Sequence, residues 1–415
     1  MRINAGDTAW VLMSAALVMF MTPGLALFYG GMVRAKNVLA MLMQNFICLG
    51  IVSVLWAVCI YSLAFHGTGR FIGNFDLAFM DHANTVPATG FGGVPIPPLS
   101  FSAFQMMFAV ITPALITGAI ADRMRFSAWF WFVVVWSLVV YTPVAHWVFS
   151  PAGWLFRRGA LDFAGGTVVH VNAGVAALVA VIVIGRRRGW PNHPTPPHSL
   201  PLTLLGTGIL WFGWFGFNAG SALGANGIAA QAFINTFFAA AAAMLGWLLF
   251  ERIRGKHATT LGAASGAVAG LVAITPCAGF VGPMASIAIG FAAGAICYFA
   301  VSVKFRFGYD DALDVVGVHL VGGLLGSLLL GLFADRAFNP AVVHQGVFVN
   351  GSWELMGDQI VAVVATVVWS AVLTFVILKV LQRVIPGGLR VPEEDEQLGL
   401  DLTQHSEVGY AYDRV

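Results

Sequence analysis

The length of the uncharged apolar runs is the feature that most constrains this chain. No residue between Asp162 and Arg186 carries a formal charge, and most side chains in this stretch are aliphatic. A helix needs about 20 consecutive apolar residues to cross the ~30 Å hydrocarbon core of a bilayer. The stretch therefore predicts a membrane-spanning helix, and His170 lies inside it.

Similar apolar runs follow one another along all 415 residues. The chain is 59% hydrophobic and 10% charged, whereas soluble domains contain about 25% charged residues. The runs are continuous rather than alternating, which favours helices over a transmembrane barrel. We therefore predict an all-α polytopic membrane protein with eleven transmembrane helices. They are expected near residues 8–32, 38–65, 101–121, 126–149, 163–185, 202–220, 226–250, 259–278, 283–303, 315–334 and 358–382.

The placement of lysine and arginine indicates the orientation. With the N-terminus outside, 16 of the 21 basic residues fall on the cytoplasmic side and 5 fall outside, which is the bias expected of membrane proteins. We expect a transmembrane domain over 1–385 and a cytoplasmic regulatory tail over 386–415. The first apolar run lacks the basic segment and the small-residue cleavage site of a signal peptide, so we expect it to be retained. The 5 basic residues counted as outside are Arg2, Arg70, Arg157, Arg158 and Arg336, and the 16 counted as cytoplasmic include Lys256 and Arg414.

Two short motifs recur five spans apart. ITPA at 111–114 is matched by ITPC at 274–277, and TVVHVNAG at 167–174 is matched by VVGVHLVGG at 315–323. Because five is odd, the second copy would cross the membrane in the opposite direction. This predicts an inverted 5+5 repeat of helices 1–5 and 6–10, with helix 11 outside it, and a substrate path between the halves. The alternative is a chance match between glycine- and valine-rich segments.

His170 and His319 occupy related positions in this repeat and are the main functional candidates. A titratable side chain inside a membrane span is costly to bury and marks a functional site by default. Apolar surroundings disfavour the charged ring, so both imidazoles are expected to be neutral, able to donate and accept hydrogen bonds. They could line a narrow polar path or relay a proton. The alternative is that each ring bonds a backbone carbonyl and ties helices together.

Aromatic side chains gather near the expected outer ends of spans three, four and six. They include Phe108, Phe149, Trp214 and Phe217, with the hydroxyl of Ser221 beside them. Aromatic faces attract cations by about 0.5–2 kcal/mol, so the group would suit a small cation that is losing its water. An ordinary interfacial belt of aromatic residues is the alternative, which composition alone favours.

Five segments carry a resemblance to a known family. They are MTPGLALFYGG at 21–31, ALDFAGGTVVH at 160–170, GWFGFNAGS at 213–221, DVVGVH at 314–319 and GLRVPEEDEQLGLDLTQHSE at 388–407. In this order they resemble the Amt/Rh ammonium transporter family, bacterial Amt branch. The resemblance implies a homotrimer in the cell (inner) membrane that takes up nitrogen as ammonium or ammonia, with methylammonium as an analogue. It implies no enzymatic activity, no metal, no cofactor and no nucleic acid.

The resemblance also implies roles for individual residues. A PII-type signalling protein would bind the tail. Asp162 and the acidic run 310–314 each precede a predicted span, so capping of a helix start is the default for both. The resemblance implies that Asp162 orients the backbone carbonyl of Ala164. The implied outer recruitment site is Phe108, Phe149, Ser221, Asp162 and Ala164, the gate is Phe108 with Phe217, and the pore is lined by Trp214, His170 and His319.

Two positions depart from the family pattern. The recruitment aromatic is commonly tryptophan, whereas this chain has Phe149, which lacks an N–H donor and attracts cations less strongly; Trp154 is a candidate to compensate. The usual His-Gly-Glu of the tail reads His405-Ser406-Glu407, and glycine tolerates backbone conformations that serine resists.

Other functions remain open at this stage. An ammonium sensor would signal through the tail to a PII-type protein, and a gas channel would conduct carbon dioxide. A membrane-embedded metalloenzyme is disfavoured, because two histidines lack an obvious third ligand.

Overall fold

The computed structural model describes residues 3–193, 195–255 and 257–410, so that Arg2, Lys256 and Arg414 of the charge pattern lie outside it. Helices, turns and loops make up this described part, and it contains no β-strand. Ten helical segments are long and apolar enough to cross a membrane, which confirms the all-α polytopic fold. These segments are Ala5–Met32, Ala35–Phe65, Pro98–Ile120, Phe126–Arg158, Gly166–Ile184, Leu200–Gly220, Gly227–Ile253, Pro283–Phe307, Val316–Phe333 and Glu354–Val384.

Several of these segments are built from more than one helix. The long helices of the first half are α1 (Ala5–Met32), α2 (Val38–Leu55), α4 (Pro98–Ile120), α5 (Phe126–Trp136), α6 (Thr142–Phe149) and α8 (Asn172–Ile184). Those of the second half are α9 (Leu200–Gly220), α10 (Gly227–Ile253), α12 (Pro283–Ala300), α14 (Val321–Phe333) and α16 (Glu354–Val384). Short helices lie between them: α3 (Tyr61–Phe65), α7 (Trp154–Arg158), α13 (Val303–Phe307) and α15 (Val347–Asn350).

The eighth predicted span, 259–278, corresponds to α11 (Thr260–Ile274), which has 15 residues. Residues 275–280 continue as turns. Pro276 explains the early end, because it has no backbone N–H with which to continue the hydrogen bonds of the helix. The predicted segment 259–278 is therefore helical only in its first three-quarters, and the count of eleven spans stays a prediction.

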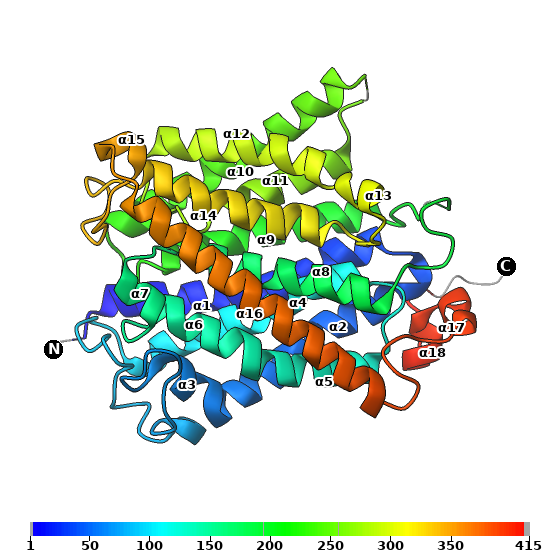
Figure 1. Ribbon diagram of the computed structural model, residues 1–415, viewed down its shortest axis with the longest axis horizontal. Helices are drawn as coiled ribbons and strands as arrows, with labels where there is room; N and C mark the ends of the chain where they lie inside the picture. Colours follow the sequence, from blue (N-terminus) through cyan, green and yellow to red (C-terminus); the bar gives the residue numbers. More distant parts are fainter. Residues whose placement is uncertain (1–2, 194, 256, 411–415) are drawn as a thin grey trace.

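The long helices lie side by side along the longest dimension of the molecule (Figure 1). The first residues of α1 lie at one end of the bundle, together with the short helices α7 and α15 (Figure 1). Helix α13 and the tail helices α17 (Glu393–Leu398) and α18 (Leu400–His405) lie at the other end (Figure 1). We call these the outer end and the inner end, after the predicted orientation. The opposite placement of α1's start and the tail agrees with an odd number of crossings.

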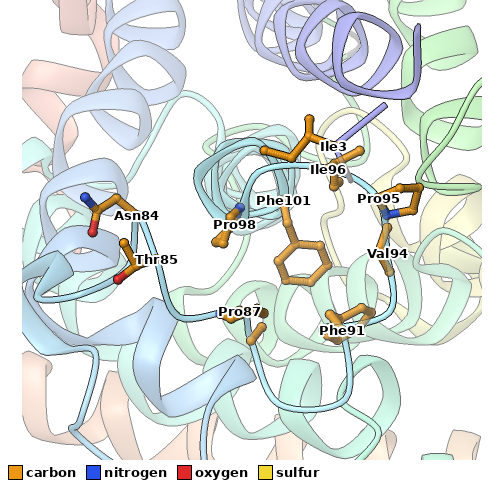
Figure 2. A pocket seen from close by; sticks show the side chains of 12 residues that line it. Ile3, Asn84, Thr85, Pro87, Phe91, Val94, Pro95, Ile96, Pro98 and Phe101 are labelled. Atoms are coloured by element: carbon orange, nitrogen blue, oxygen red, sulfur yellow. The ribbon is translucent and has the colours of Figure 1, made fainter. Parts of the chain in front are cut away.

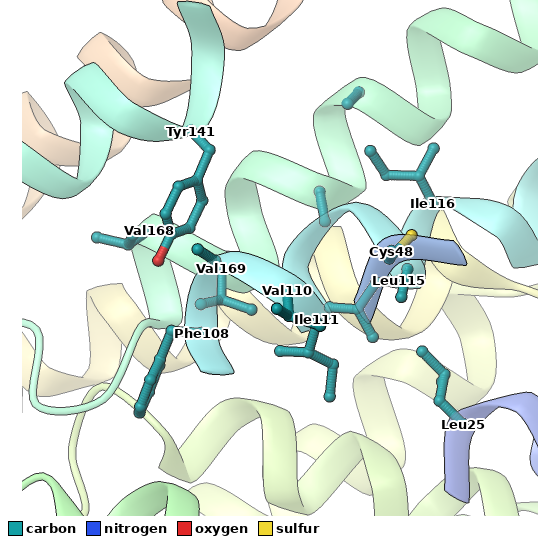
Figure 3. Packing of buried hydrophobic residues seen from close by; sticks show 14 of the residues in the cluster. Leu25, Cys48, Phe108, Val110, Ile111, Leu115, Ile116, Tyr141, Val168 and Val169 are labelled. Carbon is teal, nitrogen blue, oxygen red and sulfur yellow. The ribbon is translucent and has the colours of Figure 1, made fainter. Parts of the chain in front are cut away.

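A large apolar cluster lies between the helices. Phe108, Ile111 and Leu115 of α4 lie in it next to Val168 and Val169, which precede α8 (Figure 3). All five side chains are buried. The core therefore surrounds the segment that carries His170 with hydrocarbon.

Both histidine-bearing segments begin with a π-helical turn. These turns are η5 (Gly166–Val171), which continues as α8, and η6 (Val316–Leu320), which continues as α14. Gly174 and Gly323 follow the two histidines at the same distance along the chain. A Cβ at Gly174 would lie 2.5 Å from the backbone nitrogen of Leu320, and one at Gly323 would lie 3.0 Å from Cβ of His170. The matching turns and glycines support the predicted inverted repeat.

The close approach at Gly174 gives a first prediction. Gly174→Leu should destabilise the protein by about 3 kcal/mol, because overpacking a tight core forces backbone shifts. Gly208→Ala is the matched control, since a Cβ at Gly208 meets no atom within 4 Å. Thermal unfolding of the purified protein in detergent measures both. Equal unfolding temperatures for the two variants would contradict the observed helix crossing.

Candidate functional site

His170 and His319 lie next to each other at the centre of the bundle. Their Nδ1 atoms are 3.3 Å apart, and their ring planes differ by 18°. Both side chains are buried. In a pair of neutral rings, one Nδ1–H donates to the lone pair of the other Nδ1. The repeat related the two histidines, and the structure brings them into direct contact.

Asp162 fixes the start of the segment that carries His170. Its carboxylate accepts hydrogen bonds from the backbone N–H groups of Gly165, Gly166, Thr167 and Val168, at 2.7, 2.7, 2.8 and 3.2 Å. A helix start leaves such N–H groups without intrahelical partners. The predicted capping role is therefore observed, and it makes the direction of η5 depend on this carboxylate.

Burial raises the pKa of the Asp162 carboxyl above its ordinary value, and the four N–H donors oppose that rise. A cation in the neighbouring cavity would add to their effect, because an opposite charge favours the ionised carboxylate.

The second repeat uses Asp311 in the same way. Asp311 accepts from the backbone N–H groups of Val315 at 3.1 Å and Val316 at 2.7 Å. Asp311 precedes His319 by as many residues as Asp162 precedes His170. The sequence analysis assigned capping to the run 310–314 as a whole, whereas Asp314 at its end instead pairs with Nζ of Lys304 at 2.6 Å. The structure thus identifies Asp311 as the counterpart of Asp162.

A narrow void runs along the histidine pair. It measures about 10 Å³, close to the smallest space that holds one water molecule. Its lining residues are Met21, Leu25, Ile111, Leu115, Val169, His170, Leu210, Trp214, Phe217, Val268 and His319. The imidazoles of His170 and His319 and the indole of Trp214 are the only polar side chains among them. A small molecule in this void would therefore have hydrocarbon on most sides and imidazole on one.

Two phenylalanines close the outer end of the void. The rings of Phe108 and Phe217 have centroids 4.3 Å apart and planes tilted by 31°. Trp214 stacks on His170 at 5.4 Å, and its indole N–H donates to Oγ1 of Thr275 at 2.9 Å. The two rings lie where the resemblance implies a gate, and that role stays a prediction.

A wider cavity of about 300 Å³ lies on the outer side of the phenylalanines. Phe108, Phe149, Asp162 and Ser221 all line it. Phe149 meets Phe108 edge-on, with centroids 6.3 Å apart and planes at 83°. Ser221 donates its hydroxyl hydrogen to the carbonyl of Phe217 at 2.9 Å, so its oxygen lone pairs are available to an incoming donor. The predicted recruitment side chains therefore share one cavity.

Neither Ala164 nor Trp154 is among the residues that line this cavity. Ala164 is buried between Asp162 and the left-handed Gly165, whose φ is 111°. Trp154 packs on Trp147, with centroids 5.9 Å apart, and does not line the cavity. Compensation for Phe149 by Trp154 is thus not supported by its position.

A second hollow lies beside the outer cavity, in the loop before α4. Phe91 and Phe101 face each other in it, with centroids 4.3 Å apart, and Ile3 covers one side (Figure 2). Phe91 lines this hollow and the outer cavity alike. The loop therefore supplies an aromatic side chain to the outer cavity that the sequence analysis missed.

Other contributing residues were also missed. Gln105 lines the outer cavity. Thr275 accepts the hydrogen bond of the Trp214 indole, and Gln359 accepts one from the backbone N–H of Leu161. Thr275 lies within the ITPC motif that revealed the repeat. Gln359 is an amide within an apolar span, and such polar residues are a signal of function or of helix contact.

The tail packs against the inner end of the bundle. Glu396 accepts from the backbone N–H of Arg188 at 2.8 Å and pairs with Arg390 at 2.7 Å. Asp401 accepts from the backbone N–H of Ala40 at 2.8 Å. The tail thus contacts the loop that follows α8 and the start of α2.

Ser406 ends α18 in a left-handed conformation, with φ 56° and ψ 33°. This is the conformation that glycine adopts at least cost. The expectation that Ser406 replaces a glycine for which backbone geometry matters therefore agrees with the structure. His405 beside it packs edge-on against Phe126 at 5.0 Å, and burial lowers the pKa of its ring.

The fold and the site together define a class: a multi-pass helical membrane protein with two imidazoles in contact beneath a pair of phenylalanine rings in contact. A family model for the Ammonium Transporter Family matches residues 9–410, so this chain belongs to that family.

Relatives with assigned names are similar over nearly their whole length. An ammonium transporter of Bacillus subtilis is 51% identical, over 98% of this chain and 99% of the relative. One of Mycobacterium tuberculosis is 50% identical, over 99% of this chain and 91% of the relative.

Solved structures of proteins named Mep2 and Amt also have folds similar to that of this chain. Mep2 of Candida albicans matches with a TM-score of 0.88 and 33% identity, over 95% of this chain and 88% of that chain. A structure named "Sensor Amt Protein" matches with a TM-score of 0.87 and 31% identity, over 96% of this chain and 98% of that chain.

Proposed function

We propose that this protein carries ammonium across the cell (inner) membrane as a homotrimer, through one apolar pore in each subunit. The observation that carries the proposal is the contact between His170 and His319 in a void otherwise lined by hydrocarbon and one indole. Burying polar ring nitrogens costs free energy unless they are hydrogen-bonded, and a small polar molecule in the void would supply such a bond. Family membership and the names of the relatives support ammonium as that molecule.

The cation is selected in the outer cavity. Phe108 and Phe149 present ring faces and edges there, Ser221 offers a hydroxyl oxygen, and the Asp162 carboxylate lies among the lining groups. Aromatic faces and oxygen acceptors replace part of the water around an ammonium ion, which donates hydrogen bonds. The carbonyl of Ala164, held by the capped turn at Asp162, is the proposed further acceptor.

A largely neutral form crosses the pore. Moving an ammonium-sized ion from water into a low-dielectric interior costs several kcal/mol or more even after relaxation. Ammonia avoids that cost and can exchange hydrogen bonds with His170 and His319 as it moves. The proton left by ammonium either returns to the outer side or crosses through the histidine pair.

The histidine pair gives a second prediction. His170→Ala should allow a K⁺ current and change the ammonium current by about tenfold, because a wider, less polar void no longer selects a hydrogen-bond donor. Purified protein in liposomes on a solid-supported membrane measures both currents. His82→Ala is the control, since His82 is an exposed histidine in the outer loop. A wild-type ammonium current with K⁺ still excluded would refute the role of the pair.

The outer cavity gives a third prediction. Phe149→Trp should lower the half-saturating ammonium concentration by about threefold to tenfold, because tryptophan attracts cations more strongly and adds an N–H group. The same current recordings, with ammonium and with methylammonium, measure the change. Phe156→Trp is the matched control, because Phe156 lines the same cavity from α7 but has no proposed contact with the ion. Identical apparent affinities for wild type and Phe149→Trp would place Phe149 outside the recruitment site.

A sensor is the second candidate, and it is favoured by the likeness to the Sensor Amt Protein and by the docked tail. In this proposal the tail binds a PII-type protein and reports the presence of ammonium. Deleting 387–415 should leave the ammonium flux intact, because none of the tail residues that the structure describes, up to 410, lines the void or the outer cavity. Currents from liposomes with the truncated protein measure this. Loss of current in a protein that still folds would mean that transport depends on the tail.

A further inference from the structure

A glutamine of α16 holds the backbone just before Asp162. The amide of Gln359 accepts from the backbone N–H of Leu161 at 2.7 Å and donates to its carbonyl at 2.8 Å. The same Nε2 also donates to the carbonyl of Ser327 at 3.1 Å. Gln359 is 1% exposed. Both polar backbone groups of Leu161 are therefore satisfied by one buried side chain from a helix outside the repeat.

Leu161 connects this side chain to the outer cavity. It lines the cavity itself, and the next residue is Asp162, whose carboxylate caps η5. The contacts form a closed ring: Asp162 accepts from the Thr167 N–H, and the Thr167 hydroxyl lies 3.3 Å from that of Ser327. The carbonyl of Ser327 then returns to Gln359. A displacement of Leu161 would therefore move the capping carboxylate and the cavity wall together.

We infer that Gln359 is a positioning residue for the outer cation site: it sets the backbone that presents Asp162 and Ala164 to the incoming ion. The inference rests on the proposed function, because it assumes that this cavity recruits ammonium. Gln359 does not line the cavity and acts only through Leu161.

The second repeat shows why a neutral side chain suits this place. There the segment before η6 is held by Lys304, whose Nζ donates to the carbonyl of Asp311 at 2.8 Å. A lysine in place of Gln359 would put a positive charge near a site for cations, and like charges repel. An amide makes comparable hydrogen bonds without that charge.

One basic group near this region, Arg158, is neutralised. Arg158, at the end of α7, pairs with Asp358 at 3.0 Å, and Nδ1 of His344 lies 2.9 Å from the same carboxylate. Asp358 precedes Gln359 directly, so the start of α16 both offsets the charge of Arg158 and positions Leu161. The two contacts keep the outer cavity wall fixed without adding net positive charge.

The test separates affinity from maximal current. Gln359→Met keeps the volume but removes all three hydrogen bonds and leaves the Leu161 N–H and carbonyl without their partner. The half-saturating ammonium concentration should rise by about fivefold or more, because a loosened site binds the ion less well. The maximal current should change by less than about twofold, because the gate and the histidine pair keep their contacts.

Two further variants make the result specific. Ser370→Ala is the matched control: it removes another bond from α16 to the same span, that of the Ser370 hydroxyl to the carbonyl of Asn172 at 2.9 Å. It should leave the half-saturating concentration unchanged. Gln359→Asn keeps the polar amide but shortens the side chain, so it should give a smaller rise, and it decides the question if Gln359→Met fails to fold.

The outcomes distinguish this inference from the proposed function. Unchanged half-saturation in a folded Gln359 variant, an equal rise in Ser370→Ala, or a fall in maximal current alone would each overturn the positioning role. Wild-type protein that gives no saturable ammonium current would instead refute the proposed function, and the inference with it.

Discussion

The structure depends on the way two helices begin within the protein interior. A helix start exposes backbone N–H groups, and each one left unbonded in an apolar environment is costly. Asp162 and Asp311 provide the carboxylates that accept these hydrogen bonds. Because each carboxylate fixes a π-helical turn, it also fixes the direction of the histidine in that turn. The contact between His170 and His319 follows from these two caps and from the glycines that let the segments cross.

The sequence predicted the large features because hydrophobic length and charge placement are direct consequences of the bilayer. The apolar run after Asp162 and the basic residues at its far end identify a span and its direction. The repeat related His170 to His319, but a match in sequence contains no distance, so their contact needed the structure. Asp311 was not separated from Asp314 for a similar reason: only the observed hydrogen bonds tell which acid of the run reaches the free N–H groups.

Other features were hidden because they involve contacts between distant segments. Gln359 and Leu161 are 198 residues apart in the chain, and nothing local to either residue indicates the pairing. The position of Trp154 was also hidden, because an aromatic residue close in sequence to Phe149 packs on Trp147 and does not line the cavity. The end of α11 was misjudged because composition continued to favour a helix where Pro276 stops one. The residue assignments of the recruitment site and gate stay predictions that the geometry supports.

The contact between two Nδ1 atoms gives the histidine pair a direction. With both rings neutral and a single hydrogen between the Nδ1 atoms, one ring has a bare Nε2 and the other has an Nε2–H. The pair thus presents an acceptor at one end and a donor at the other. A proton that entered at the bare nitrogen and left from the other end would reverse this polarity. Both rings would then have to return to their first tautomers before another proton could follow the same route. A relay built in this way would therefore pass one proton at a time, with a change of tautomer in both rings between one proton and the next.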